Sequence, residues 1–179
     1  MEVVGWEMSA VDPAFCGLGC LITPGITMRT SSDAPGITSF TDEQLVRVAR
    51  LFASNDSLAA HLDDLPADGN RRRASLAGTP HLEMWAITWP PGSTSGWHDH
   101  GAASGAFVVV RGSLLEEVHL PSGEKTTRVV TADEHRWLAP GLIHRTSAFG
   151  DSPALTVHAY APSLAGARTY ESAELRTDA

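Results

Sequence analysis

Three histidines are spaced so that they could hold one metal ion. His98 and His100 follow a turn containing proline and glycine, and a single residue separates them. On a β-strand, residues two apart project from the same face, roughly 6 to 7 Å apart along the chain. An isolated pair of this kind is more simply two surface residues. His144, which follows a second turn at Pro140-Gly141, favours a shared site because it repeats the pattern far along the chain.

The metal is left open by spacing alone, since neutral imidazoles bind iron, zinc, copper and nickel. Asp99 lies between two of the histidines and would point to the opposite face of a strand. We therefore expect Asp99 to brace an imidazole or bind nearby backbone rather than to ligate the metal.

A second group of polar side chains shares one face of a predicted strand. Thr156, His158 and Tyr160 alternate with aliphatic residues from Leu155 to Ala159. The pattern alone permits two arrangements, with the polar face either inside the fold or against solvent. An inward polar face would turn these three side chains into the interior of the barrel.

The predicted elements divide the chain into helical and β regions. Thr41 can cap a helix that runs to about Ala53, with Gln44 completing a capping box. A second short helix is expected over residues 57–62, capped by Ser57. From His81 to Tyr160, short runs rich in valine, tryptophan and threonine alternate with turn residues, which indicates a barrel or sandwich.

The domain organisation follows from these elements. Residues 1–37 contain several prolines and glycines without periodicity and are interpreted as an arm or irregular cover. Residues 38–179 form the predicted domain, with a helical segment at 41–65. The tail from Ser163 is assigned no chemistry.

Composition excludes several classes of function. The chain has 179 residues, 42% of them apolar, and a formal net charge of -8, which argues against nucleic acid as a partner. No apolar run approaches the roughly 20 residues of a membrane span. The N-terminus does not have the pattern of a secretory signal, so a cytoplasmic location is expected. Cys16 and Cys20 are interpreted as ordinary thiols.

The metal motif resembles the two signatures of the cupin superfamily. Gly92, His98-x-His100 and Gly112 resemble the first signature, and Pro140-Gly141-x-x-His144 resembles the second. The resemblance implies a mainly β fold, the cupin double-stranded β-helix or jelly-roll barrel, with the N-terminal helices packed outside. The usual glutamate ligand after the second histidine is missing, because Ser104 and Gly105 stand there.

Together with Thr156-x-His158-x-Tyr160-x-Pro162, the motif resembles cysteine dioxygenase. The resemblance implies that His98, His100 and His144 hold Fe(II), and that the enzyme adds both atoms of O2 to the sulfur of a small thiol, L-cysteine in the first instance. It implies that Tyr160 donates to the reacting groups, positioned by His158 and Thr156.

The same family resemblance assigns the substrate carboxylate to an arginine about 26 residues before the first metal histidine. That count points to Arg72, with Arg73 as the alternative. Mammalian members have a cysteine where this chain has Gly105, so the resemblance implies that no crosslink to Tyr160 forms. Asn70 stands where many relatives have a tyrosine.

Three alternatives to a cysteine dioxygenase remain open at this point. The substrate could be 3-mercaptopropionate or another small thiol, the protein could be a cupin that binds metal without turnover, or it could be a zinc isomerase or hydrolase. Glu116 and Glu117 point to opposite faces of a strand, which argues against a carboxylate pair for glycoside chemistry. The remaining four histidines are interpreted as structural or solvent-facing; they are His61, His81, His119 and His135.

Overall fold

A computed structural model describes residues 39–63, 68–171 and 175. The proposed arm at 1–37 and both cysteines lie outside these residues. The elements, in chain order, are α1 (Asp42–Ala53), η1 (Asp56–Ala59), α2 (Ala60–Asp63), β1 (Arg72–Gly78), β2 (Glu83–Trp89), β3 (Trp97–His98), β4 (Ser104–Arg111), β5 (Ser113–His119), β6 (Lys125–Thr131), β7 (His135–Leu138), β8 (Ile143–Ala148), β9 (Ala154–Ala161) and β10 (Thr169–Tyr170).

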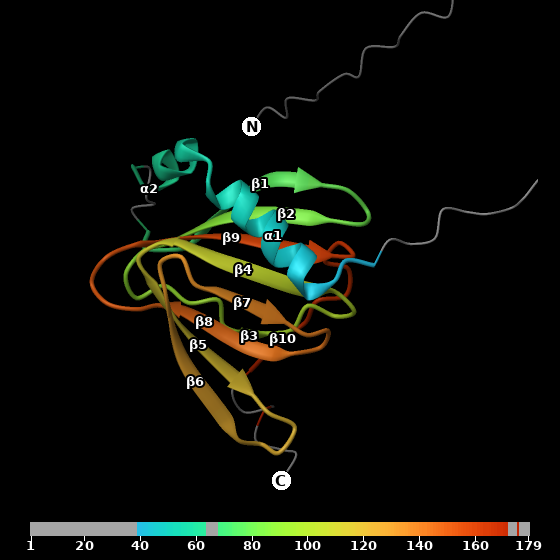
Figure 1. The fold of residues 1–179 in the computed structure, drawn as a ribbon. Helices are drawn as coiled ribbons and strands as arrows, with labels where there is room; N and C mark the ends of the chain where they lie inside the picture. The colour runs from blue at the N-terminus through green and yellow to red at the C-terminus, as the bar shows by residue number, and fades with distance from the viewer. Residues whose placement is uncertain (1–38, 64–67, 172–174, 176–179) are drawn as a thin grey trace, which may run out of the picture. The chain divides into compact units, whose positions relative to one another are not determined.

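The strands form two antiparallel sheets, which confirms the mainly β prediction (Figure 1). One five-stranded sheet has the order β1-β2-β9-β4-β7, and the other has the order β10-β3-β8-β5-β6. Side chains from both sheets, including Trp89, Phe107 and Leu114, pack together between them. Burial of these apolar side chains is the main force that holds the two sheets face to face.

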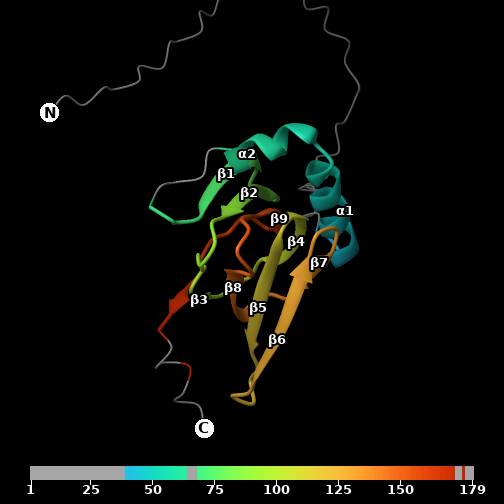
Figure 2. The ribbon, with the colours of Figure 1, turned by 90° about the vertical axis from the view of Figure 1, so that its left-hand side faces the viewer.

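Helix α1 covers the outer face of the first sheet, as predicted for the N-terminal helical segment (Figure 2). Leu45 and Ala49 of the helix pack with Leu155, Val157 and Ala159 of β9 in a second apolar cluster. Strand β9 is therefore buried on both faces, and its polar residues at the alternate positions must face the interior between the sheets.

The helix caps agree with the sequence at one place and differ at another. Thr41 and Gln44 form the predicted capping box of α1. The second helical turn is capped by Asn55, whose side chain accepts from the Ser57 backbone N–H, so the prediction of Ser57 as the cap was wrong. Asn55 has the β-region backbone that an N-cap needs and lies two residues earlier.

Among the helices that the structure describes, none has the length and apolar character of a membrane-spanning helix.

Candidate metal centre and substrate cavity

Two neighbouring strands of the second sheet, β3 and β8, bring the three histidines together. His98 of β3 lies directly opposite His144 of β8 in the strand register. His100 follows two residues after His98, just past the end of β3 and before a turn at Gly101. The imidazole centroids lie 4.7 to 5.1 Å apart. Among the described residues these three form a cluster whose potential ligand atoms all lie within 4.8 Å of one another.

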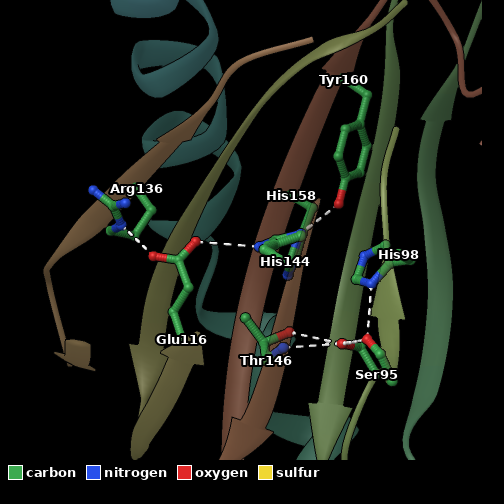
Figure 3. A network of polar contacts seen from close by, with 9 residues as sticks. Ser95, His98, Glu116, Arg136, His144, Thr146, His158 and Tyr160 are labelled. Atoms are coloured by element: carbon green, nitrogen blue, oxygen red, sulfur yellow. Dashed lines mark hydrogen bonds and ion pairs between the residues drawn. The ribbon is translucent and has the colours of Figure 1, made fainter. Parts of the chain in front are cut away.

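The hydrogen bonds of two of the histidines leave a nitrogen available for a metal (Figure 3). The Nδ1 atom of His98 lies 3.1 Å from the Gly96 carbonyl, so it must carry the proton. The Nδ1 atom of His144 lies 3.2 Å from the Glu116 carboxylate and donates to it in the same way. In the described part of the chain, the buried Nε2 of His144 and Nδ1 of His100 have no hydrogen-bond partner. These donors fit a metal ion held by neutral imidazoles.

The protonation of the histidines supports the same conclusion. Burial lowers the pKa of His98 to about 4, with the neighbouring His144 adding to the effect. Burial also lowers the pKa of His100 to about 3, and both other histidines contribute. Because each pKa lies well below neutrality, these imidazoles are uncharged at pH 7 and keep a lone pair for a metal.

Glu116 is a buried carboxylate that the sequence reasoning did not connect to the metal site. Its side chain is 1% exposed, and one oxygen accepts the bond from His144 while the other pairs with Arg136 (Figure 3). Burial opposes ionisation, but the bonds from His144 and Arg136 lower the pKa of Glu116 overall. Glu117 points outward and pairs with Arg145, so the prediction that the two acids face opposite ways is confirmed.

Asp99 binds backbone, which is one of the two roles expected for it. Its Oδ1 accepts from the backbone N–H of Gly101 at 2.9 Å and of Arg168 at 3.1 Å. Its other oxygen accepts from the Tyr170 hydroxyl. These bonds, together with the pairing of β10 and β3, hold residues 168–170 beside the three histidines.

The polar residues of β9 face the space between the sheets and form a hydrogen-bonded chain. The Thr156 hydroxyl lies 2.8 Å from Nε2 of His158, and Nδ1 of His158 lies 2.9 Å from the Tyr160 hydroxyl. The imidazole of His158 stacks on Phe107, with centroids 5.1 Å apart. The Tyr160 ring lies 4.7 Å from that of His100, which places the end of the chain beside the three histidines.

Trp89 adds a fourth member that the sequence reasoning missed. Its indole N–H donates to the Thr156 hydroxyl oxygen at 2.9 Å. The Thr156 proton can then go to His158 at 2.8 Å or to the Ile87 carbonyl at 3.4 Å, and the shorter contact favours His158. His158 would then donate from Nδ1 to the Tyr160 oxygen, which leaves the phenol proton free to point toward the cavity.

Burial fixes the charge state of this chain. It lowers the pKa of His158 well below its usual value and raises the pKa of the Tyr160 phenol, an effect that the positive charge of Arg71 partly opposes. Both groups are therefore neutral at pH 7, and Tyr160 keeps its proton. The Tyr160 ring also lies against Gly105, where an added Cβ would approach the ring to 2.8 Å.

A cavity of about 180 Å3 opens beside His98, His100 and Tyr160. Arg73 lines this cavity, and so does Arg71. Arg72 projects to the other face of β1 and lines a separate cavity with Ser57 and His61, to which Arg73 also contributes. The side-chain alternation of a strand explains the difference, because Arg71 and Arg73 share one face and Arg72 takes the opposite one.

The C-terminal segment also lines the cavity. Leu164, Ala167, Arg168 and Thr169 contribute to its wall, although the sequence suggested no chemistry for this tail. Thr169 pairs with His98 in the register of β10 and β3, which explains how the segment reaches the site. One indication of this arrangement was readable in the sequence, the expectation that Asp99 binds backbone. One of its backbone partners is Arg168, in this distant segment.

The other four histidines take no part in the described metal cluster. His119 lies 2.9 Å from the Leu175 carbonyl, and His135 accepts from Arg50 at 3.0 Å. His61 lines the cavity of Arg72, and His81 is exposed. These positions agree with structural or solvent-facing roles.

Known structures share this architecture. An uncharacterized conserved protein with a double-stranded beta-helix domain from Klebsiella pneumoniae subsp. pneumoniae MGH 78578 has a TM-score of 0.56 at 19% identity, covering 66% of this chain and 97% of that one. An oxalate oxidase matches with a TM-score of 0.51 at 24% identity, over 58% of this chain and 56% of its own. The protein TT1209 from Thermus thermophilus matches with a TM-score of 0.51 at 14% identity, over 59% of this chain and 94% of its own. These likenesses show the cupin fold.

The sequence itself matches a family over most of its length. Residues 40–173 match the family described as cysteine dioxygenase type I. The matched range contains the three histidines, the chain from Trp89 to Tyr160, and the arginines of β1. The chain therefore belongs to the cysteine dioxygenase type I family, whose members are metal-dependent dioxygenases of the cupin type.

Proposed function

We propose that this protein is an Fe(II)-dependent thiol dioxygenase that adds both atoms of O2 to the sulfur of a small thiol carboxylate and releases the sulfinate. L-cysteine is the first substrate to test because of the family. The observation that carries the proposal is the cluster of three histidines beside the protonated Tyr160 hydroxyl, at the end of a cavity lined by arginine. The reaction balances without a reductant, since sulfur supplies all the electrons that O2 accepts.

His98, His100 and His144 would hold the iron. When bound, iron(II) would supply the redox chemistry that activates dioxygen. The absence of a carboxylate from the described cluster agrees with a site that leaves room for an anionic substrate.

The protein's own groups would position the substrate and supply a proton. We assign the substrate carboxylate to Arg73, which lines the cavity, in place of Arg72, which does not. A guanidinium can donate two parallel hydrogen bonds to a carboxylate and so fixes its orientation. Tyr160 would donate its hydroxyl proton to negative charge that develops near sulfur and oxygen.

His158 and Thr156 would keep the Tyr160 hydroxyl in place. His158 is buried and neutral, and it is held by Thr156 on one side and by stacking on Phe107 on the other. A fixed imidazole that donates to the phenol oxygen would direct the phenol proton toward the substrate. The three residues would therefore work as one positioned donor, with Trp89 holding the far end.

Oxygen uptake by metal-loaded protein tests the proposal. The Fe(II)-loaded protein should consume O2 when given L-cysteine, 3-mercaptopropionate or another small thiol carboxylate, and the sulfinate should accumulate in equal amount. The Zn(II)-loaded protein is the matched control, because zinc has no redox chemistry and should give no uptake. No O2 uptake by the iron form with any small thiol would favour a cupin that binds metal without turnover. Purification with zinc, and an activity that needs no O2, would favour the isomerase or hydrolase alternative.

A further inference from the structure

The cavity beside the histidines is unusually rich in positive charge. Arg71, Arg73 and Arg168 all line it, from two segments far apart in the sequence. Among the residues that line it, Asp99 is the acid. A single carboxylate needs only one guanidinium, so the cavity holds more cations than a substrate with one acidic group can use.

Two acids near the cavity offset part of this charge, but in the described residues neither forms an ion pair with the three arginines. Asp99 accepts from two backbone N–H groups and from the Tyr170 hydroxyl, and it offsets at most the charge of Arg168, which helps to lower the pKa of Asp99. Glu83 accepts from the Trp85 indole and the Leu164 backbone. Within residues 39–63 and 68–171, none of the three arginines belongs to an ion pair.

Two of the arginines are held in position by aromatic rings. The guanidinium of Arg71 lies 5.2 Å from the centroid of Trp89, and that of Arg73 lies 4.8 Å from the centroid of Trp85. Stacking occupies the face of a guanidinium and leaves its N–H edge for acceptors. In the described residues, Arg71 donates one long hydrogen bond, 3.4 Å to the Ser95 carbonyl. The remaining N–H groups are available to a ligand.

We infer that this cavity takes a thiol that carries two acidic groups, such as a sulfanyl dicarboxylate, with Arg73 binding one carboxylate and Arg71 and Arg168 binding the other. The inference rests on the proposed thiol dioxygenase function and names its substrate class. Because the lining carries three guanidinium groups, a second carboxylate meets free donors there. The reaction remains the addition of O2 to a thiolate to give a sulfinate.

Two thiols that differ by one carboxylate give the sharpest test. The iron-loaded protein should use 2-sulfanylbutanedioate with a kcat/KM at least about tenfold higher than that for 3-sulfanylpropanoate, because a charged hydrogen bond is worth roughly 1.5–3 kcal/mol. An equal or higher kcat/KM for 3-sulfanylpropanoate would overturn the inference while leaving the thiol dioxygenase intact.

Variants of the arginines assign the preference to the cavity. Arg71→Gln and Arg168→Gln should each reduce kcat/KM for the dicarboxylate by about tenfold and change the value for 3-sulfanylpropanoate much less. Arg72→Gln is the matched control, since Arg72 lies on the same strand but lines the other cavity. Equal losses for both thiols in Arg71→Gln, or a loss of dicarboxylate preference in Arg72→Gln, would contradict the assignment.

Calorimetry on the zinc-loaded protein separates this inference from the proposed reaction. Zinc supports no oxidation, so the measurement reports binding alone. Tighter binding of 2-sulfanylbutanedioate than of 3-sulfanylpropanoate supports a cavity for two acidic groups even if the iron form oxidises no thiol. Equal binding of the two thiols overturns the inference whatever the iron form does.

Discussion

Glu116 holds His144 from the side opposite the metal cluster: its Oε1 lies 3.2 Å from the Nδ1 of that histidine, and Arg136 pairs with its other oxygen (Figure 3). A carboxylate in this position fixes the orientation and tautomer of the imidazole and makes it a stronger ligand. The glutamate ligand that is usual in cupins is missing from the cluster, but the Glu116 carboxylate is hydrogen-bonded to one of the three histidines.

Replacing Glu116 with glutamine should therefore weaken metal binding. The expected loss in affinity is about 10–100-fold, because the imidazole of His144 loses its charged acceptor. Competition with a coloured chelator measures the affinity. Glu117→Gln is the control, since that acid pairs with Arg145 on the outside of the sheet. Equal affinities in the two variants would show that Glu116 does not support the ligand.

Replacing His144 with alanine should abolish stoichiometric metal binding. Two of the three imidazoles would remain, and neither can take the place of the missing ligand in the described cluster. Metal analysis after iron loading provides the readout. His81→Ala should keep its full metal content, because His81 is exposed and outside the cluster. If His144→Ala retained a full equivalent of iron, the ligand assignment would be wrong.

Sequence periodicity predicted the N-terminal helix and the strands, and the resemblance to the family implied the cupin barrel and most of the site. The capping box of Thr41 and Gln44 and the alternation around His158 were both readable because they depend on local spacing. The position of Glu116 was partly readable too. Glu116 lies two residues from both Leu114 and Val118, which are buried, so alternation along the strand places its side chain on the same inner face.

Other features depended on contacts that spacing does not encode. Counting along the chain pointed to Arg72, but Arg71 and Arg73 line the cavity beside the histidines. The residue at which β1 begins and the orientation of the strand decide which arginines face this cavity. Strand β1 itself is mostly half-buried or exposed and lacks a clear apolar pattern. The bond from Arg168 to Asp99 joins segments far apart in the sequence, so no local pattern predicted that the tail would line the site.

Replacing Trp89 with phenylalanine should slow turnover and leave metal affinity unchanged. The change removes the indole N–H, so the Thr156 oxygen loses its buried donor and the chain to Tyr160 loses its anchor. The free energy of unfolding should fall by about 1–3 kcal/mol. Steady-state oxygen uptake and chemical denaturation measure both effects. Trp137→Phe is the control, because Trp137 is 42% exposed. A normal kcat in Trp89→Phe would show that the indole N–H does not help to position Tyr160.

Replacing Gly105 with alanine should displace the Tyr160 ring. The new Cβ would lie 2.8 Å from one ring carbon and 2.9 Å from the next, closer than carbon atoms pack. We expect a loss of about 1–3 kcal/mol in the free energy of unfolding and a reduced kcat with the metal retained. Gly78→Ala is the control, since an added Cβ there meets nothing within 4 Å. Equal kcat values in the two variants would show that the site tolerates a shift of Tyr160.

The most direct measurement of the central claim follows the oxygen atoms. The Fe(II)-loaded protein should be supplied with a thiol carboxylate and isotope-labelled O2 in unlabelled water, and the sulfinate product should be analysed by mass spectrometry. Dioxygenation predicts that both oxygen atoms of the sulfinate carry the label. A sulfinate with one oxygen from water, or thiol oxidation to disulfide with release of peroxide, would contradict it.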